Sequence, residues 1–165
     1  MFDAIEQQIV DELAGVPAKA NAEGGQRSEV PWTKYVQQAV VDVGRRNGSK
    51  TAASGCSSDD GAEWLYDVVW YQVDEHGSMR DVPLVAECEW GGPRAIKVDF
   101  EKLLVARARY RVMIFQTSTD AEAQASINLL KGYITNCRLS RAGDRYLFVV
   151  WARDRWAPPE SYVVP

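Results

Sequence analysis

Side chains that usually bind zinc or form nucleophilic triads are scarce in this sequence. The 165 residues include one histidine, His76, and three cysteines that lie far apart, Cys56, Cys88 and Cys137. A structural zinc site needs about four closely spaced Cys or His ligands, so this composition argues against one. A Ser–His–Asp triad would depend on His76, which stands in the turn-like stretch DEHGS, and that argues against triad chemistry. Unpaired thiols are typical of a reduced, cytoplasmic protein.

Long apolar runs and phosphate-loop motifs are also missing. No run approaches the roughly 20 apolar residues of a membrane-spanning helix, so we expect no membrane partner. The stretch 1–15 contains acidic residues and lacks the basic residues with which a signal peptide begins, so it does not have the pattern of a signal peptide. Neither a Gly-x-Gly-x-x-Gly nor a Walker-type loop is present, and this argues against nucleotide binding by those devices.

Charge is distributed unevenly along the chain. The net charge of −4 excludes a wholly basic nucleic-acid-binding surface. Residues 1–90 contain 7 basic and 16 acidic residues, whereas residues 91–165 contain 12 basic and 7 acidic ones. This asymmetry is either chance or a sign that one part binds cations and the other meets anions. Nucleic acid therefore remains a possible partner of the basic half.

An N-terminal helix and a linker are predicted before the main domain. Apolar residues within 2–13 recur at helical spacing, and the polar stretch 18–29 that follows Pro17 is typical of a linker. We expect 1–29 to form this helix and linker, with the helix packed either on a partner chain or back on its own domain. Residues 30–165 have the length of a single domain.

The main domain is predicted to alternate between strands and helices. In chain order the patterns indicate a helix at 31–46, strands at 49–54, 62–73 and 82–90, a helix at 100–109 capped by Asp99, a strand at 111–117, a helix at 120–136, a strand at 145–152 and an irregular tail. A hairpin followed by a helical crossover between strands predicts an α/β fold, in which helices flank a mixed central sheet.

Acidic residues interrupt two of these predicted strands. In VAECEW, Glu87 and Glu89 lie two residues apart, so both side chains leave the same face of strand 82–90. Asp67 stands inside the aromatic strand 62–73, where aspartate is uncommon. Burying carboxylates without a counter-charge is costly, and a divalent cation such as Mg²⁺ or Mn²⁺ removes that cost. We expect either a metal site at these three acids or a hairpin face on which they are solvated.

This arrangement resembles the PD-(D/E)xK nuclease superfamily, also called restriction-endonuclease-like. Its αβββαβ core corresponds to residues 30–117 here, and a C-terminal helix and strand extend it. The resemblance implies that Asp67 is the metal-binding aspartate of the second strand and that Glu87 opens the third-strand motif. Glu89 stands where the family usually has lysine, as in the Glu-x-Glu members that remain active.

In the family that the chain resembles, a lysine can also be supplied by the following helix; if none reaches the site, the metal ions alone would have to activate the water. Lys102 in DFEKLL is the first candidate and Lys97 the second. The alternative is that Lys102 is a solvated helix residue whose stem lies along apolar surface. In the implied mechanism Asp67, Glu87 and Glu89 hold Mg²⁺, which activates a water for attack on a phosphodiester, and Lys102 lies near that water or the phosphate.

The sequence thus predicts a metal-dependent nuclease that acts on DNA. The alternatives are an inactive domain of this fold that binds nucleic acid or protein, and an unrelated α/β fold with acids on its surface. No separate recognition domain is visible, so a homodimer or a partner protein is expected to supply specificity. Basic residues of the second half are expected to contact phosphates, or else serve as solubilising charge: Arg94, Lys97, Arg107, Arg109, Arg111, Arg138, Arg141 and Arg145.

Overall fold

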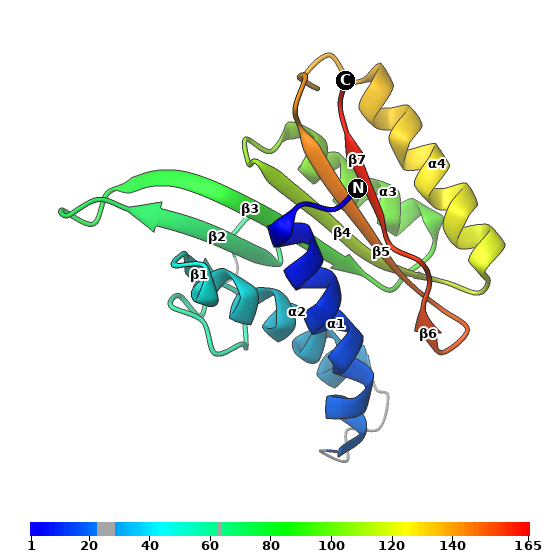
Figure 1. Cartoon of the computed structure of the whole chain (residues 1–165), viewed down its shortest axis with the longest axis horizontal. Helices are drawn as coiled ribbons and strands as arrows, with labels where there is room; N and C mark the ends of the chain where they lie inside the picture. Colours follow the sequence, from blue (N-terminus) through cyan, green and yellow to red (C-terminus); the bar gives the residue numbers. More distant parts are fainter. Residues whose placement is uncertain (23–28, 63) are drawn as a thin grey trace. The chain divides into compact units, whose positions relative to one another are not determined.

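A computed structural model of the chain describes residues 1–22, 29–62 and 64–165, with the side chains of 29–31 left out of the description (Figure 1). The chain divides into two compact units. The first unit comprises Met1–Leu84 and the second Val85–Pro165. Part of the predicted linker, residues 23–28, and the strand position 63 lie outside the described residues.

The first helix, α1 (Ala4–Ala22), is longer than predicted. Pro17 was expected to end it, yet Pro17 lies inside the helix and residues 18–22 are helical. The reason is burial, because Ile9, Leu13, Val16 and Ala20 recur at helical spacing and are all buried. Continuing this apolar face outweighs the hydrogen bond that a proline inside a helix removes.

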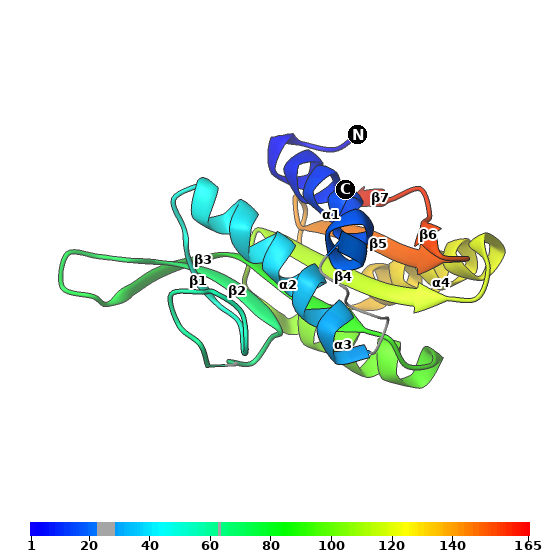
Figure 2. The ribbon, with the colours of Figure 1, turned by 90° about the horizontal axis from the view of Figure 1, so that it is seen from below.

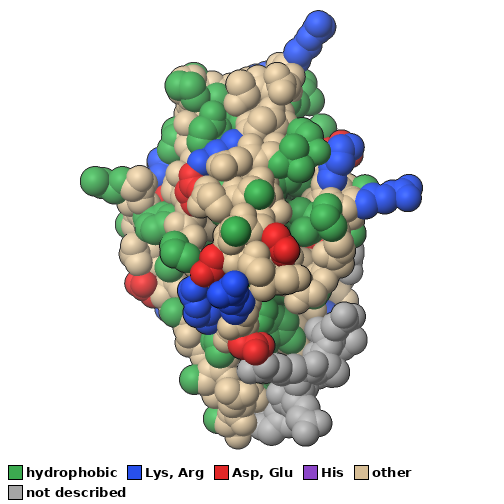
Figure 3. Space-filling view, turned by 90° about the vertical axis from the view of Figure 1, so that its right-hand side faces the viewer, with side chains coloured by type: hydrophobic (Ala, Val, Ile, Leu, Met, Phe, Trp, Pro, Cys, Tyr) green, Lys and Arg blue, Asp and Glu red, His purple; other side chains and the backbone are tan. Residues whose placement is uncertain are grey.

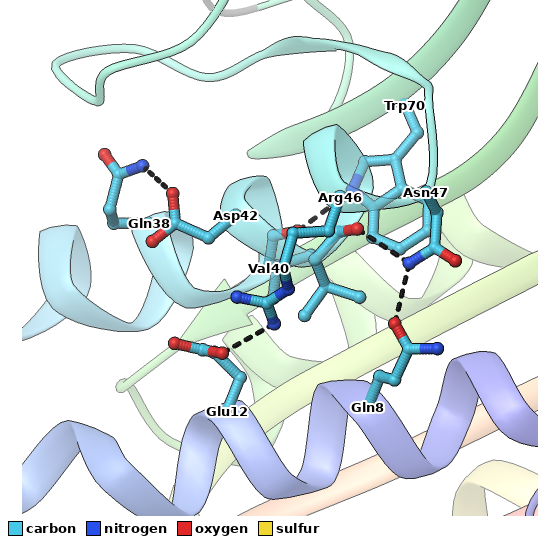
Figure 4. A network of polar contacts seen from close by, with 9 residues as sticks. Gln8, Glu12, Gln38, Val40, Asp42, Arg46, Asn47 and Trp70 are labelled. Carbon is cyan, nitrogen blue, oxygen red and sulfur yellow. Dashed lines mark hydrogen bonds and ion pairs between the residues drawn. The ribbon is translucent and has the colours of Figure 1, made fainter.

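The second helix, α2 (Glu29–Arg46), is close to the prediction and packs against α1. Figure 4 shows the polar contacts between the two helices: Arg46 pairs with Glu12 at 2.6 Å, and the Asn47 side chain donates to Gln8 at 2.7 Å. Of the two arrangements expected for the N-terminal helix, packing on its own chain is the one observed.

Three antiparallel strands follow in the first unit. They are β1 (Lys50–Ala52), β2 (Val68–Val73) and the first part of β3 (Met79–Glu89), in the order β1–β2–β3. The turn 74–78 joins β2 to β3, where the Asp74 N–H donates to the Ser78 carbonyl at 2.9 Å. The prediction of a strand from residue 62 was wrong, because the chain bends before β2 and Asp67 lies in that bend.

Trp70 of β2 anchors the sheet of this unit to α2. Its ring is 2% exposed, and its indole N–H donates to the Val40 carbonyl at 3.1 Å (Figure 4). Gly44 makes this close approach possible, because a Cβ at Gly44 would lie 2.6 Å from the ring. Buried tryptophan with a satisfied N–H is a large source of stability in a small core.

The second unit is a mixed sheet with two helices. After the last part of β3 come α3 (Pro93–Val105), β4 (Tyr110–Thr117), α4 (Asp120–Asn136), β5 (Arg145–Ala152), β6 (Arg155–Trp156) and β7 (Glu160–Val163). Strands β4 and β5 are parallel, as expected for a helical crossover, while β6 and β7 pair antiparallel with β5. Both α3 and α4 pack on the sheet and on each other (Figure 2). The tail predicted to be irregular therefore contains two short strands.

Helix α3 differs most from its prediction. It was expected at 100–109 with Asp99 as its cap, but it begins at Pro93 after Gly92 and ends at Val105. Proline is favoured in the first turn, since its missing N–H has no partner there in any case. Asp99 is therefore a mid-helix residue, and it shares a helix face with Lys102 three positions later.

The expected fold class is confirmed. The described residues form four helices and seven strands, and parallel and antiparallel pairs occur in a sheet flanked by helices. The three cysteines are free thiols. Among the described residues no helix is both long and apolar enough to cross a membrane. On the face in Figure 3, acidic and basic side chains lie close together and apolar side chains form only small groups.

Candidate functional site

A buried carboxylate lies near the end of β3. Glu87 is 1% exposed, and its neighbours Ala86 and Cys88 are also buried. Strand alternation places Glu89 on the same face as Glu87, as the sequence predicted. Because an ionised carboxylate in this environment is costly without a positive partner, the identity of that partner is the first question about the site.

Lys102 of α3 is the positive partner. Its Nζ lies 3.2 Å from Glu87 Oε1 and donates to Oε2 at 3.3 Å, and it lies 2.8 Å from Asp99 Oδ1. The Lys102 side chain is 38% exposed, so the amine connects a buried acid with the surface. The structure thus brings together Glu87 and Lys102, two residues that the sequence analysis proposed for one site.

Glu89 ends β3 and turns back on its own backbone. One of its oxygens accepts the N–H of Gly91, and the carboxyl is hydrogen-bonded to the side chain of Asp99. A side chain at Gly91 is not compatible with this turn, because a Cβ there would lie 2.8 Å from Glu89 Oε1. Glu87, Glu89, Asp99 and Lys102 therefore form one carboxylate–lysine cluster at the end of β3 and along α3.

The surroundings of the cluster raise the pKa of Glu89 and that of Lys102. Partial burial raises the pKa of Glu89, the Gly91 N–H opposes this, and the hydrogen bond to Asp99 adds to the rise. Burial alone would lower the pKa of Lys102, but the hydrogen bond to Asp99 and the charge of Glu87 outweigh it and raise that pKa. Lys102 is consequently protonated at neutral pH.

Asp99 is the member of the cluster that the sequence analysis missed. It was interpreted as a helix cap because the helix was expected to begin at residue 100. The signal that identifies its role is the Gly-Gly-Pro sequence at 91–93, which is a good helix start. Once α3 begins at Pro93, the spacing of three between Asp99 and Lys102 places both on one face.

A cavity of about 500 Å³ borders the cluster. Glu89 and Asp99 line it on the acidic side, Arg94 adds a positive charge, and Pro93 and Val98 form part of the apolar wall. This size is within the range of about 300–1,000 Å³ typical of small-ligand pockets. The cluster is thus accessible from outside although Glu87 itself is not.

The outcomes for the other sequence-predicted residues differ from one another. Asp67 belongs to the first unit, directly before β2, and its convergence with Glu87 stays a prediction. Lys97, the second candidate lysine, instead pairs with Glu101 at 2.7 Å. Of the basic residues expected at the site, Arg94 lines its cavity, while three line a different cavity: Arg107, Arg111 and Arg141.

Within the described residues, the cluster supplies the type of donor atom that a hard divalent cation binds, but not the arrangement of a metal site. Glu87, Glu89 and Asp99 supply carboxylate oxygens, the ligand type that Mg²⁺ and Mn²⁺ prefer. As the side chains stand, the described part of the chain contains no group of three His, Cys, Asp or Glu residues arranged to hold a metal ion.

The arrangement places carboxylate oxygens and a positive amine side by side. These are the groups that phosphoryl chemistry uses to offset negative charge. Searches with the chain against protein-family models, curated proteins and solved structures found no match.

Proposed function

We propose that the chain is a restriction-endonuclease-like, metal-dependent nuclease that hydrolyses phosphodiester bonds in DNA. The single observation that carries this proposal is the contact of Lys102 with buried Glu87, at 3.2 and 3.3 Å. In a Glu-x-Glu variant of the family motif another element can supply the lysine, and here Lys102 of α3 contacts the first glutamate of the motif.

Lys102 acts in this proposal through its charge. Its pKa is raised, so at neutral pH it does not accept a proton from water. A fixed ammonium beside the reacting phosphate instead stabilises the negative charge that develops on the phosphate oxygens. Its pairing with Asp99 and Glu87 orients the amine before substrate binds, which lowers the reorganisation needed during reaction.

Glu87 and Glu89 would hold the Mg²⁺ or Mn²⁺ ion together with Asp67, and Asp99 would orient Glu89. A bound ion of this kind lowers the pKa of a coordinated water and polarises the phosphate. Glu87 is buried and thus held rigidly, whereas Glu89 lines the cavity in which the substrate phosphate would bind. Basic residues such as Arg94, which lines that cavity, would contact the DNA backbone.

The proposal also covers the cellular location of the enzyme and the source of its DNA specificity. Free thiols at Cys56, Cys88 and Cys137 are consistent with a cytoplasmic location, where thiols stay reduced. DNA specificity would come from a second copy of the chain or from a partner protein, because a small chain has little surface left for sequence recognition.

The test is a plasmid-cleavage assay with Mg²⁺ or Mn²⁺ that compares wild type with four variants. We expect Asp67→Asn, Glu87→Gln and Lys102→Met each to lower the cleavage rate at least about 100-fold, since each removes charge stabilisation of the transition state. Lys97→Met is the matched control on the same helix, and its activity should equal that of wild type.

Two outcomes would contradict the proposal. Cleavage that persists in Glu87→Gln would show that the site is wrong or that a contaminant is active. DNA binding by wild type without any cleavage would instead favour the alternative function, an inactive domain of this fold that serves as an interaction module.

A further inference from the structure

A second cavity in the second unit lies at the start of the parallel strands β4 and β5. Its volume is about 410 Å³, and it is lined by Arg107, Arg111, Arg141 and Asp144 together with apolar residues that include Leu104 and Leu139. The proposed nuclease does not use this cavity. Three arginines and one aspartate leave a net positive charge around it.

Arg111 is the buried centre of this arrangement. The side chain is 5% exposed, Nη2 donates to the Ala106 carbonyl at 2.8 Å, and Nη1 lies 3.2 Å from Asp144 Oδ1. Within the described residues, Nε and Nη1 of Arg111 make no hydrogen bond. Buried donors are nearly always satisfied, and since Nη1 has the Asp144 carboxylate at ion-pair distance, it is Nε that calls for an acceptor beyond the described residues.

The two exposed arginines stand on loops whose backbones are held in place. Arg107 lies between α3 and β4, beside Ala106, whose carbonyl Arg111 binds. Arg141 lies between α4 and β5, and its N–H donates to Asp144 Oδ2 at 3.0 Å. Asp144 thus contacts both Arg111 and the Arg141 loop, which keeps two of the arginines at one cavity.

Charge balance identifies the class of ligand. The C-terminus of α3, which ends at Val105 on the cavity wall, contributes a partial negative charge of about one half. The positive charge of three guanidinium groups is larger than the negative charge of the helix end and Asp144 together, so the cavity favours an anion. Arginine from several directions suits a phosphate with three terminal oxygens, and the apolar wall and the volume suit an attached organic group.

We propose that this cavity binds a phosphate monoester that carries an organic group, as in a nucleoside monophosphate or the terminal phosphate of a nucleic-acid strand. Arg111 would donate from Nε, and Arg107 and Arg141 would contact the remaining oxygens. The inference goes beyond the proposed nuclease and does not depend on it.

The test is titration calorimetry on the full chain with EDTA present, so that metal-dependent cleavage plays no part. The probes are deoxyadenosine 5′-monophosphate, deoxyadenosine, and one oligonucleotide with and without a 5′-phosphate. We expect the monophosphate to bind at least about tenfold more tightly than the nucleoside, since charge-assisted hydrogen bonds are lost without phosphate. The double variant Arg107→Gln/Arg141→Gln should weaken that binding at least about tenfold.

Arg109→Gln is the matched control. Arg109 is an exposed arginine of the same segment that does not line the cavity and lies over the ring of Tyr110. Its variant should bind the monophosphate as wild type does. Because all three substitutions are at exposed residues, loss of folding does not obscure the comparison.

The outcomes separate the two sources of the ligand. Preference for the 5′-phosphorylated oligonucleotide identifies a strand end, and binding of the free monophosphate without such preference identifies a nucleotide; both support the proposal. Equal affinity for monophosphate and nucleoside, no binding at millimolar ligand, or a double variant that matches Arg109→Gln would overturn it.

Discussion

The two units of the chain handle buried charge differently. Among the described residues of the first unit, the buried acid is Glu6, which accepts the N–H of Asp3 at the start of its own helix at 3.0 Å. In the second unit the buried charges are Glu87 and Arg111, and each contacts a residue from another element. A charge satisfied by its own helix end is a capping device. A charge that meets a distant partner beside a cavity is a candidate for ligand binding, and both such charges lie in the second unit.

Net charge follows the same division. Residues 1–84 contain 14 acidic and 7 basic residues, whereas residues 85–165 contain 9 acidic and 12 basic ones. The unit with the excess of basic residues also holds both cavities described above. Anionic ligands are therefore expected to bind the second unit.

The largest expected effect comes from Trp70→Ala. Truncating a buried aromatic residue typically lowers the free energy of unfolding by about 3–5 kcal/mol, and the Val40 carbonyl also loses its donor. If the two units are separate folding units, hydrogen exchange measured by mass spectrometry should rise in α2, β1 and β2 and stay unchanged in α4. The matched variant in the second unit, Phe148→Ala, should give the reverse pattern.

The two units would not be separate folding units if Trp70→Ala and Phe148→Ala changed hydrogen exchange in the same regions. An equal rise of exchange across both units in Trp70→Ala would mean that the chain unfolds as a single cooperative unit.

An intermediate effect is expected from Lys102→Met. The variant keeps the apolar stem but removes the charge next to buried Glu87, and we expect the free energy of unfolding to fall by about 2 kcal/mol, less than for a fully buried pair because Lys102 is partly exposed. Urea denaturation measures this. Lys97→Met, at an exposed pair with Glu101, should leave the free energy of unfolding close to that of wild type.

A double variant sharpens the result. Because Glu87→Gln removes the charge that Lys102 balances, the cost of Lys102→Met should shrink in the Glu87→Gln background. Strictly additive costs would show that the contact contributes nothing to stability.

The smallest effect is a pH dependence that Glu89→Gln should remove. The pKa of Glu89 is raised by partial burial and by Asp99, so the folded state retains a proton that the unfolded state releases. Stability conferred by that proton is present at low pH and lost as pH rises from the ordinary value of 4.5 through the raised one. At neutral pH the variant should be more stable than wild type, by less than about 1 kcal/mol.

Urea denaturation between about pH 4 and pH 8 checks this sign. Glu75→Gln in the exposed turn after β2 is the control and should follow the wild-type profile. If the stability advantage of Glu89→Gln over wild type instead grew as the pH falls, the raised pKa of Glu89 would be contradicted.

Local signals predicted the second half of the fold best. The bounds of α4 and β5 agree with the sequence prediction because the Thr119 side chain caps α4, accepting the Glu122 N–H at 3.2 Å, and because RYLFVVWA is a continuous apolar run. The errors lie at α1 and α3, where Pro17 and Pro93 were given the wrong weight. A proline inside a buried helix face and one in a first turn look alike in sequence, and only packing distinguishes them.

The candidate site was partly predictable for the same reason. Alternation along β3 placed Glu87 and Glu89 on one face, and Lys102 was expected to reach them. Asp99 was not identified, since its role depends on where α3 begins. The basic pocket was not predicted either, because its three arginines had been assigned to the borders of the acidic site.

By itself the sequence determined the α/β class, the order of elements from α2 to β5 and the shared face of Glu87 and Glu89, because repeats of 2 and about 3.6 residues follow from backbone geometry alone. The tertiary structure decided the partners of the buried charges. Lys102 meets Glu87 across 15 positions of sequence, and Arg111 meets Asp144 from another element. Such contacts depend on how a helix or loop packs beside a strand, which no local pattern specifies.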